Sequence, residues 1–156
     1  NQGHKKRLMR IVMSLWLLAV VVSVNACAQT PLTNKTPLTR LPMGIGYGIS
    51  DVLCEDVKNT SIPKRLKELE IPFEWIDQEK GLLTVGPITE KKESDSVYSK
   101  IRQRYFLEVV CGDELTTSIK GEAAIEGLNT AGEWIAITDA ATIEQHSMQF
   151  LQSLDL

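Results

Sequence analysis

The chain has 156 residues, 17 basic and 20 acidic side chains and a net charge of −3, so its length bounds the folded part to about one ordinary domain. The acidic balance disfavours nucleic acid as a partner, because a phosphate-binding surface needs a basic patch. The basic clusters Lys64-Arg65, Lys91-Lys92 and Arg102/Arg104 are each interleaved with acidic residues, which indicates solvated faces.

The N-terminal residues predict an export signal. Basic side chains at positions 5–10 precede an apolar run of 14 residues from Ile11 to Val24. As a helix this run spans only about 21 Å, which is shorter than the roughly 30 Å hydrocarbon core. We therefore predict that residues 1–26 are a cleaved signal peptide. Four basic residues precede Cys27 and no acidic ones do, so the remaining chain has 13 basic against 20 acidic residues, a net charge of −7.

The end of this signal, Val24-Asn25-Ala26-Cys27, resembles the lipobox of bacterial lipoproteins. The resemblance implies that Cys27 is lipidated and binds the membrane through its lipid. Because Ala28 rather than aspartate follows the cysteine, it also implies the periplasmic face of the outer membrane. The alternative is ordinary signal cleavage after Ala28, which would release a soluble periplasmic or secreted protein.

A tether is expected between the anchor and the folded part. Residues 27–47 are mostly Thr, Pro, Leu, Asn and Gly, and Thr-Pro-Leu-Thr occurs at 30–33 and again at 36–39. Glycines at 44, 46 and 48 lack the strand and helix that a phosphate-binding loop requires, so they indicate flexible chain. We predict a lipidated N-terminus and tether over 27–47 and a single domain over 48–156.

The predicted domain begins with helices and a hairpin. Ser50 or Asp51 is expected to cap a short helix, Asn59–Ser61 to interrupt it, and a second helix to run from Pro63 to before Pro72. The hairpin pairs strands at 73–75 and 82–85 around a turn at Gly81, and Gly86-Pro87 ends it.

Three further strands and a helix complete the chain. Strands are expected at 98–111, 115–128 and 133–138, joined by short turns into an antiparallel meander. Asp139 is the candidate N-cap of the last helix. The apolar face of this helix comprises Ile143, Ser147, Phe150, Leu151 and Leu154.

The strand at 98–111 has two different faces. One row is predicted to enter the core: Ile101, Tyr105, Leu107, Val109 and Cys111. The opposite row is predicted to be a contact face for a partner: Arg102, Arg104, Phe106, Glu108 and Val110. An exposed Phe106 and Val110 would mark that contact patch.

These elements predict an α+β fold. We expect an antiparallel sheet of about five strands, hairpin plus meander, with the N-terminal and C-terminal helices packed on one face in a helix-grip arrangement. The segment from Ile62-Pro63 to Gly81-Leu82-Leu83-Thr84-Val85 resembles the helix-then-hairpin unit of BamC-like lipoproteins of the outer-membrane β-barrel assembly machinery. That resemblance implies the architecture and an envelope location.

Two cysteines remain after Cys27. In an oxidising compartment Cys54 and Cys111 are able to form a disulfide, and two unlinked buried thiols are the alternative. Neither has a CxxC partner or a nearby histidine, so we predict no metal site and no cofactor.

Two hypotheses for function stay open. The first is a non-enzymatic envelope lipoprotein that binds or scaffolds a partner protein through the face of Arg102 to Val110. The second is a small periplasmic ligand-binding or hydrolase domain that uses His146, the sole histidine after Cys27. No GxSxG motif accompanies His146, so we predict no enzymatic activity.

Overall fold

The computed structural model describes residues 37–93 and 96–156. The predicted signal peptide and the predicted lipidation site Cys27 lie outside these residues. Residues Leu38–Leu156 form one compact folded unit.

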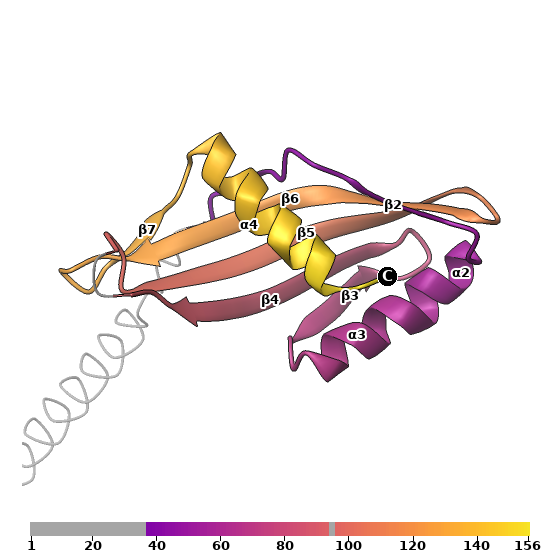
Figure 1. Ribbon diagram of the computed structural model, residues 1–156, viewed down its shortest axis with the longest axis horizontal. Coiled ribbons are helices and arrows are strands. Elements are labelled where there is room, and N and C mark those ends of the chain that lie inside the picture. Colours follow the sequence, from indigo (N-terminus) through magenta and orange to yellow (C-terminus); the bar gives the residue numbers. More distant parts are fainter. Residues whose placement is uncertain (1–36, 94–95) are drawn as a thin grey trace, which may run out of the picture. The chain divides into compact units, whose positions relative to one another are not determined.

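Seven antiparallel strands form one sheet in the order β1-β6-β5-β4-β3, and β2 and β7 also pair with β6 (Figure 1). The strands are β1 (Leu41–Pro42), β2 (Tyr47–Ser50), β3 (Phe73–Asp77), β4 (Leu82–Lys91), β5 (Lys100–Asp113), β6 (Thr116–Leu128) and β7 (Trp134–Ala136). The short strands β2, β1 and β7 pair successively along the same edge of β6, so the sheet is five positions wide.

The two long strands, β5 and β6, form the centre of the sheet. Their register pairs Tyr105 with Ala123 and Val109 with Ile119, and all four side chains are buried. This alternation confirms the predicted core row at Ile101, Tyr105, Leu107 and Val109. Cys111, the last member of that predicted row, is instead exposed where the strand leaves the core.

The N-terminal helices form one continuous helical segment. It consists of α2 (Cys54–Asp56), the π-helical turn η1 (Val57–Ser61) and α3 (Ile62–Glu68). The predicted break at Asn59–Ser61 is wrong, because Val57 and Ile62 on either side of it are buried in the core and hold the backbone helical. Pro63 cannot donate an amide hydrogen to the preceding turn, and the wider π turn comes directly before it.

The start of this helical segment also differs from the prediction. The N-cap residue is Leu53, and no side chain caps the first turn. Asp51 instead lies in the loop after β2 with a φ of 65°. The loop is held by backbone bonds to the β5–β6 turn, because Asp51 N donates to Leu115 O and Cys54 N donates to Glu114 O. These tertiary bonds replace the predicted cap.

Strand β4 continues beyond the predicted stop at Gly86-Pro87. Its pairing with β5 shifts between Val85 and Ile88 and then resumes as far as Lys91. Gly86 has a φ of 105°, and a Cβ there would lie 2.6 Å from the carbonyl oxygen of Gln103. Glycine and proline therefore form a β-bulge inside the strand rather than its end.

The segment before Gly48 differs from the predicted tether over its last residues. Leu41 and Pro42 pair with Ala123 and Glu122 as strand β1, and Met43 is fully buried in the core. Residues from Leu41 onward therefore belong to the folded unit. The sequence concealed this because a strand of two residues has no readable periodicity.

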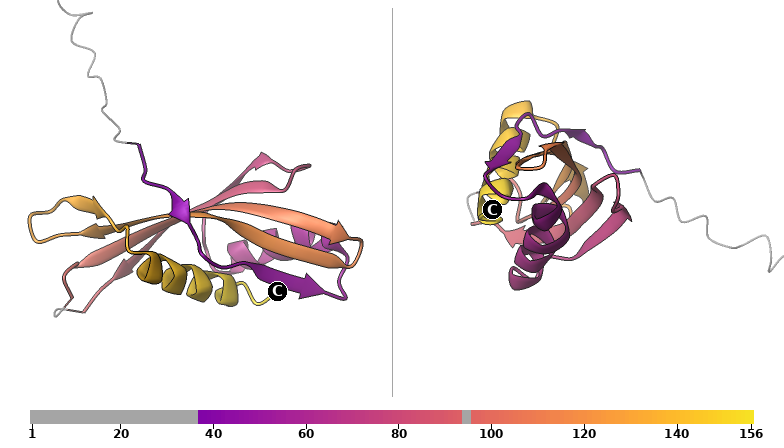
Figure 2. Two further views of the ribbon diagram at one scale, coloured as in Figure 1. Left: turned by 90° about the horizontal axis from the view of Figure 1, so that it is seen from above. Right: turned by 90° about the vertical axis from the view of Figure 1, so that its right-hand side faces the viewer.

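Within the folded unit, helices α2, α3 and α4 lie on the same side of the sheet (Figures 1 and 2). Helix α4 (Ala140–Ser153) crosses the central strands, and Phe150 stacks on Tyr105 with ring centroids 4.2 Å apart. Asp139 is its N-cap, as predicted, and accepts a hydrogen bond from the Thr142 amide. The predicted α+β class is therefore confirmed, with the helices of the N-terminal region and of the C-terminus packed against one face.

Candidate binding face on the outer side of the sheet

The opposite side of the sheet carries the row predicted as a contact face. We define the outer face as Arg102, Arg104, Phe106, Glu108 and Val110 of β5 with the neighbours that share their side of the sheet. Register places Glu126 opposite Arg102, Ala124 opposite Arg104 and Glu122 opposite Phe106. No helix covers this face among the described residues (Figure 2).

Arg40 covers the ring that was expected to be exposed. Its guanidinium carbon lies 3.7 Å from the centroid of Phe106, and its Nη2 donates a hydrogen bond of 3.0 Å to Glu122 Oε1. Phe106 and Val110 are both half-buried, not exposed. Arg40 precedes β1 in the segment predicted as tether, so the pairing of Leu41 with β6 is what brings it here.

A second arginine repeats this arrangement at the β7 end. Arg102 donates from Nε and Nη2 to Glu126 Oε1 at 3.1 and 2.9 Å, and its guanidinium carbon lies 4.1 Å from the ring centroid of Trp134. The side chains of Arg102 and Glu126 are only 28% and 17% exposed, which makes this the most buried ion pair of the outer face. Such a pair holds its side chains in one conformation.

Arg104 differs from its two neighbours. It lies between Arg102 and Phe106 on the same side of β5, opposite the small side chain of Ala124 and beside the Gly86-Pro87 bulge. Its Nε is buried without a hydrogen-bond partner, and it makes no ion pair with any described residue.

A groove of about 600 Å³ continues from Phe106 toward the β3–β4 hairpin. Its lining includes Phe106, Ile76, Leu82 and Thr84, with Glu108 and Lys120 on its rim. Ile76 lies at the bulge of β3 and is 65% exposed. The outer face thus combines apolar groove walls with charged side chains held by their neighbours.

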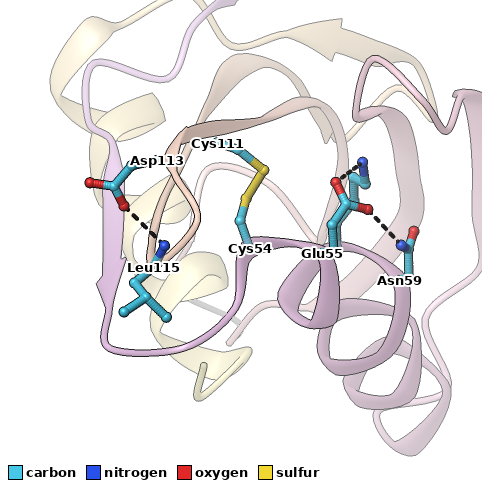
Figure 3. The surroundings of a disulfide bond; sticks show 7 residues. Cys54, Glu55, Asn59, Cys111, Asp113 and Leu115 are labelled. Carbon is cyan, nitrogen blue, oxygen red and sulfur yellow. Dashed lines mark hydrogen bonds and ion pairs between the residues drawn. A yellow bond between two sulfur atoms is a disulfide. The ribbon is translucent and has the colours of Figure 1, made fainter.

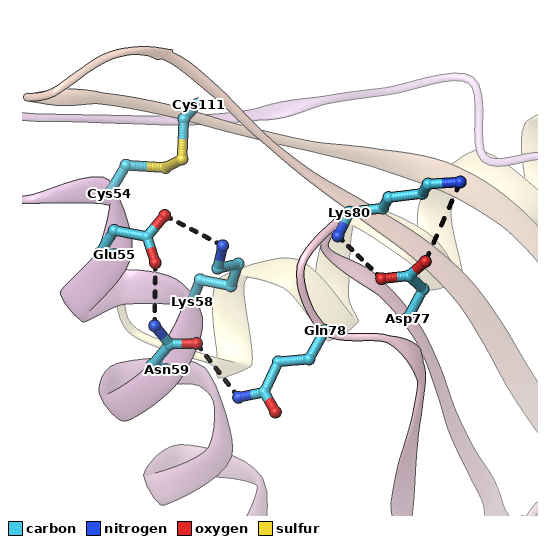
Figure 4. Close-up of polar contacts among 8 residues, drawn as sticks. All are labelled: Cys54, Glu55, Lys58, Asn59, Asp77, Gln78, Lys80 and Cys111. Atoms are coloured by element: carbon cyan, nitrogen blue, oxygen red, sulfur yellow. Dashed lines mark hydrogen bonds and ion pairs between the residues drawn. A yellow bond between two sulfur atoms is a disulfide. The ribbon is translucent and has the colours of Figure 1, made fainter.

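The predicted disulfide joins the helical segment to the sheet at the end of β5 (Figure 3). Cys54 and Cys111 have Cα atoms 5.7 Å apart. Beside it, Glu55 accepts hydrogen bonds of 3.0 Å from Lys58 and from Asn59, and Asn59 in turn accepts one from Gln78 (Figure 4). The hydrogen bond from Lys58 lowers the pKa of Glu55. The disulfide indicates an oxidising compartment outside the cytoplasm.

His146 lies half-buried on α4, on the helix-covered side of the sheet. Burial and the positive charge of Lys92 lower its pKa, and Glu90 opposes the shift. Within the described residues it has no hydrogen bond to a serine or a carboxylate. Its neighbour Ser147 is fully buried, and Ser147 Oγ has no hydrogen-bond partner in the described part of the chain.

Metal-holding clusters and membrane-spanning helices are both absent from the described residues. Over residues 37–93 and 96–156, no three His, Cys, Asp or Glu side chains cluster in a way that would hold a metal ion. In the same residues, no helix combines the length and apolar character needed to span a bilayer.

No family model matches the chain, and no curated protein matches it. A DUF4468 family protein from Bacteroides ovatus, solved by crystallography, is similar with a TM-score of 0.39 and 13% sequence identity. The similarity covers 76% of this chain and 80% of that protein. The resemblance to BamC-like lipoproteins stays a prediction.

Proposed function

We propose that this chain is a non-enzymatic lipoprotein of the cell envelope that binds or scaffolds a partner protein through the outer face of its sheet. One observation carries the proposal: the helices cover one side of the sheet, while the other side presents aromatic and charged side chains already held in place. Arginine and aromatic residues are enriched at protein interfaces.

The fixed conformations of these side chains favour binding energetically. Arg40 and Arg102 are each held by a carboxylate and an aromatic ring. A partner that docks on them therefore does not need to immobilise these side chains. Ordering a flexible side chain on binding costs roughly 0.5–1.5 kcal/mol of conformational entropy. The outer face is preorganised for contact.

The proposed location is the periplasmic face of the outer membrane. The lipobox-like segment before Cys27 supports a lipid anchor, and the disulfide supports an oxidising compartment. With Cys27 acylated, the lipid would keep the domain next to membrane-bound partners.

Metabolic labelling with palmitate tests the anchor. We expect the wild-type chain to incorporate label and to fractionate with the envelope, and we expect the Cys27→Ala variant to do neither. Labelling that persists in the variant, or a wild-type chain that is unlabelled and freely released, would contradict the anchor.

Site-specific photocrosslinking in cells tests the binding face. A photoreactive amino acid at Val110 is expected to give a discrete crosslinked protein. The same group at Met148, which is exposed on α4, serves as the matched control. Phe106→Ala is expected to lower the yield at position 110 at least fivefold, because interface aromatics contribute about 1 kcal/mol or more. Equal crosslinking at both positions would refute the proposal.

A further inference from the structure

We infer that Arg104 is the anion-binding residue of the outer face, and that the partner presents an acidic side chain next to apolar ones in an extended polypeptide segment. The inference rests on the proposed function, because it names the chemistry that the outer face recognises. It is carried by the charge balance of this face, by the unpartnered state of Arg104 and by the adjoining groove.

The outer face is neutral, whereas the domain as a whole is negative. The folded unit Leu38–Leu156 has 12 basic and 20 acidic residues. The strand registers place six of those cations on the outer face: Arg40, Lys91, Lys100, Arg102, Arg104 and Lys120. They place six carboxylates there: Glu74, Asp77, Glu108, Asp113, Glu122 and Glu126. The face is therefore neutral, whereas the rest of the unit has 6 basic and 14 acidic residues, so an anionic partner segment is repelled less here than elsewhere on the unit.

Arg104 is the arginine of this face whose charge is not compensated by its neighbours. Arg40 and Arg102 each have a carboxylate within 3.0 Å and an aromatic ring beneath the guanidinium. Arg104 has neither among the described residues, and its buried Nε has no acceptor. Because the buried Nε is out of a partner's reach, a partner carboxylate would accept from the terminal nitrogens Nη1 and Nη2, in the two-pronged geometry that guanidinium and carboxylate share.

The surroundings favour a single carboxylate over a phosphate. Glu122 and Glu126 lie opposite Phe106 and Arg102, so they flank Arg104 diagonally across β6. Both are already paired, with Arg40 and Arg102, so a single uncompensated guanidinium remains and one carboxylate matches its charge. The domain's overall negative charge acts in the same direction against polyanions such as nucleic acids.

The groove defines what accompanies the acidic residue. Phe106 follows Arg104 by two positions on the same face, a distance of about 7 Å along the strand, and begins the groove that Ile76 and Leu82 line. Successive same-side residues of an extended peptide have this same spacing. A segment with an acidic residue at one position and an apolar residue two positions later would therefore engage both features.

A synthetic probe tests the inference directly. The probe is the fluorescent heptapeptide Ser-Glu-Ser-Leu-Ser-Leu-Ser, and its control replaces the glutamate by glutamine. Both are titrated with the full chain in mild non-ionic detergent, and binding is followed by fluorescence anisotropy. We expect the glutamate peptide to bind at least tenfold more tightly than the glutamine peptide, with affinity that falls as salt rises.

Two variants of the chain separate a specific site from general charge. Arg104→Gln is expected to abolish the tenfold preference for glutamate, and Arg104→Lys to restore only part of it, because lysine keeps the charge but lacks the two-pronged geometry. Lys91→Gln removes one charge from the same face and is expected to leave the preference intact. Circular dichroism and the Tm of each variant confirm that the fold is retained.

Four results would overturn the inference. They are absence of peptide binding, equal binding of both peptides, equal loss in Arg104→Gln and Lys91→Gln, and Arg104-dependent binding of phosphatidylglycerol vesicles or inorganic phosphate without peptide binding. Crosslinking at Val110 distinguishes this failure from failure of the proposed function. If that crosslink persists while the peptide result is negative, the binding face stands and the role of Arg104 falls.

Discussion

Glu70 adopts a backbone conformation that glycine usually provides. It follows α3 with a φ of 56°, and two backbone bonds close the helix end around it: Glu70 N to Lys67 O at 3.1 Å and Ile71 N to Leu66 O at 2.9 Å. This is the pattern of a Schellman C-cap. The buried Leu66 and the partly buried Ile71 hold the turn although glutamate is unfavourable in it.

Glu70→Gly is therefore expected to stabilise the protein by about 1 kcal/mol, because glycine enters the left-handed region without a Cβ clash. Urea unfolding measures the change. Lys67→Gly, three residues earlier inside α3, is the control and is expected to destabilise by about 1 kcal/mol. Destabilisation by both variants would show that the φ of Glu70 carries no cost.

His146 predicts a pH dependence of stability. Its folded-state pKa is lowered from 6.5 by burial and by Lys92, so the unfolded chain binds the proton more tightly. Its contribution is complete above the unfolded pKa of about 6.5 and is lost as pH falls through the folded pKa. We expect the wild type to lose more unfolding free energy than His146→Asn between pH 7.5 and pH 5. Urea unfolding at each pH measures this loss. A difference that does not change with pH would contradict this.

At the scale of elements, α4 is attached to the sheet by one side. Leu151 is 1% exposed, whereas Met148 on the same helix is 41% exposed. Arg65 of α3 also donates from Nε to the Ser153 carbonyl at 3.1 Å, which links the C-terminal ends of the two helices.

Leu151→Ala is expected to cost about 2–5 kcal/mol of unfolding free energy, because it removes buried methyl groups and leaves a cavity. Met148→Ala should change it by no more than about 0.5 kcal/mol. Thermal unfolding followed by circular dichroism measures both. Similar losses in the two variants would mean that α4 is not oriented as described.

For the molecule as a whole, the disulfide connects the helical segment to the end of strand β5. Cys54 and Cys111 are 57 residues apart in sequence. Closing a loop of this length removes about 4 kcal/mol of unfolded-state entropy in the chain model. We expect the Cys54→Ala/Cys111→Ala variant to lose stability of this order in urea unfolding, and the wild type to lose a similar amount in dithiothreitol. Insensitivity of the wild type to dithiothreitol would contradict a stabilising bridge.

The two sides of the sheet differ in how they contribute to stability. The helix-covered side contains the core, including Tyr105, whose pKa is raised by burial and whose hydroxyl donates to Gln103 Oε1. The outer face contributes ion pairs. Ion pairs at solvent-exposed sites stabilise proteins by only about 0–1 kcal/mol each. This small contribution to stability agrees with the contact role proposed for the outer face.

Elements with strong periodicity could be predicted from the order of residues alone. The two-residue alternation of β5 and β6 and the amphipathic pattern of α4 with Asp139 as N-cap predicted the α+β class and most of the core. They also placed Arg102 to Val110 on the side away from it. The residue pattern within one element predicts these features, because buried side chains recur with the period of the helix or strand.

The positions of short or irregular segments became known from the folded structure and could not be predicted. It made Leu41–Pro42 a strand, kept the helix continuous through Asn59–Ser61, and turned Gly86-Pro87 into a bulge. It also brought Arg40 over Phe106, 66 positions away in the chain, and left Arg104 without a partner among the described residues. Such contacts depend on packing between distant residues, and no periodicity within a single segment encodes them.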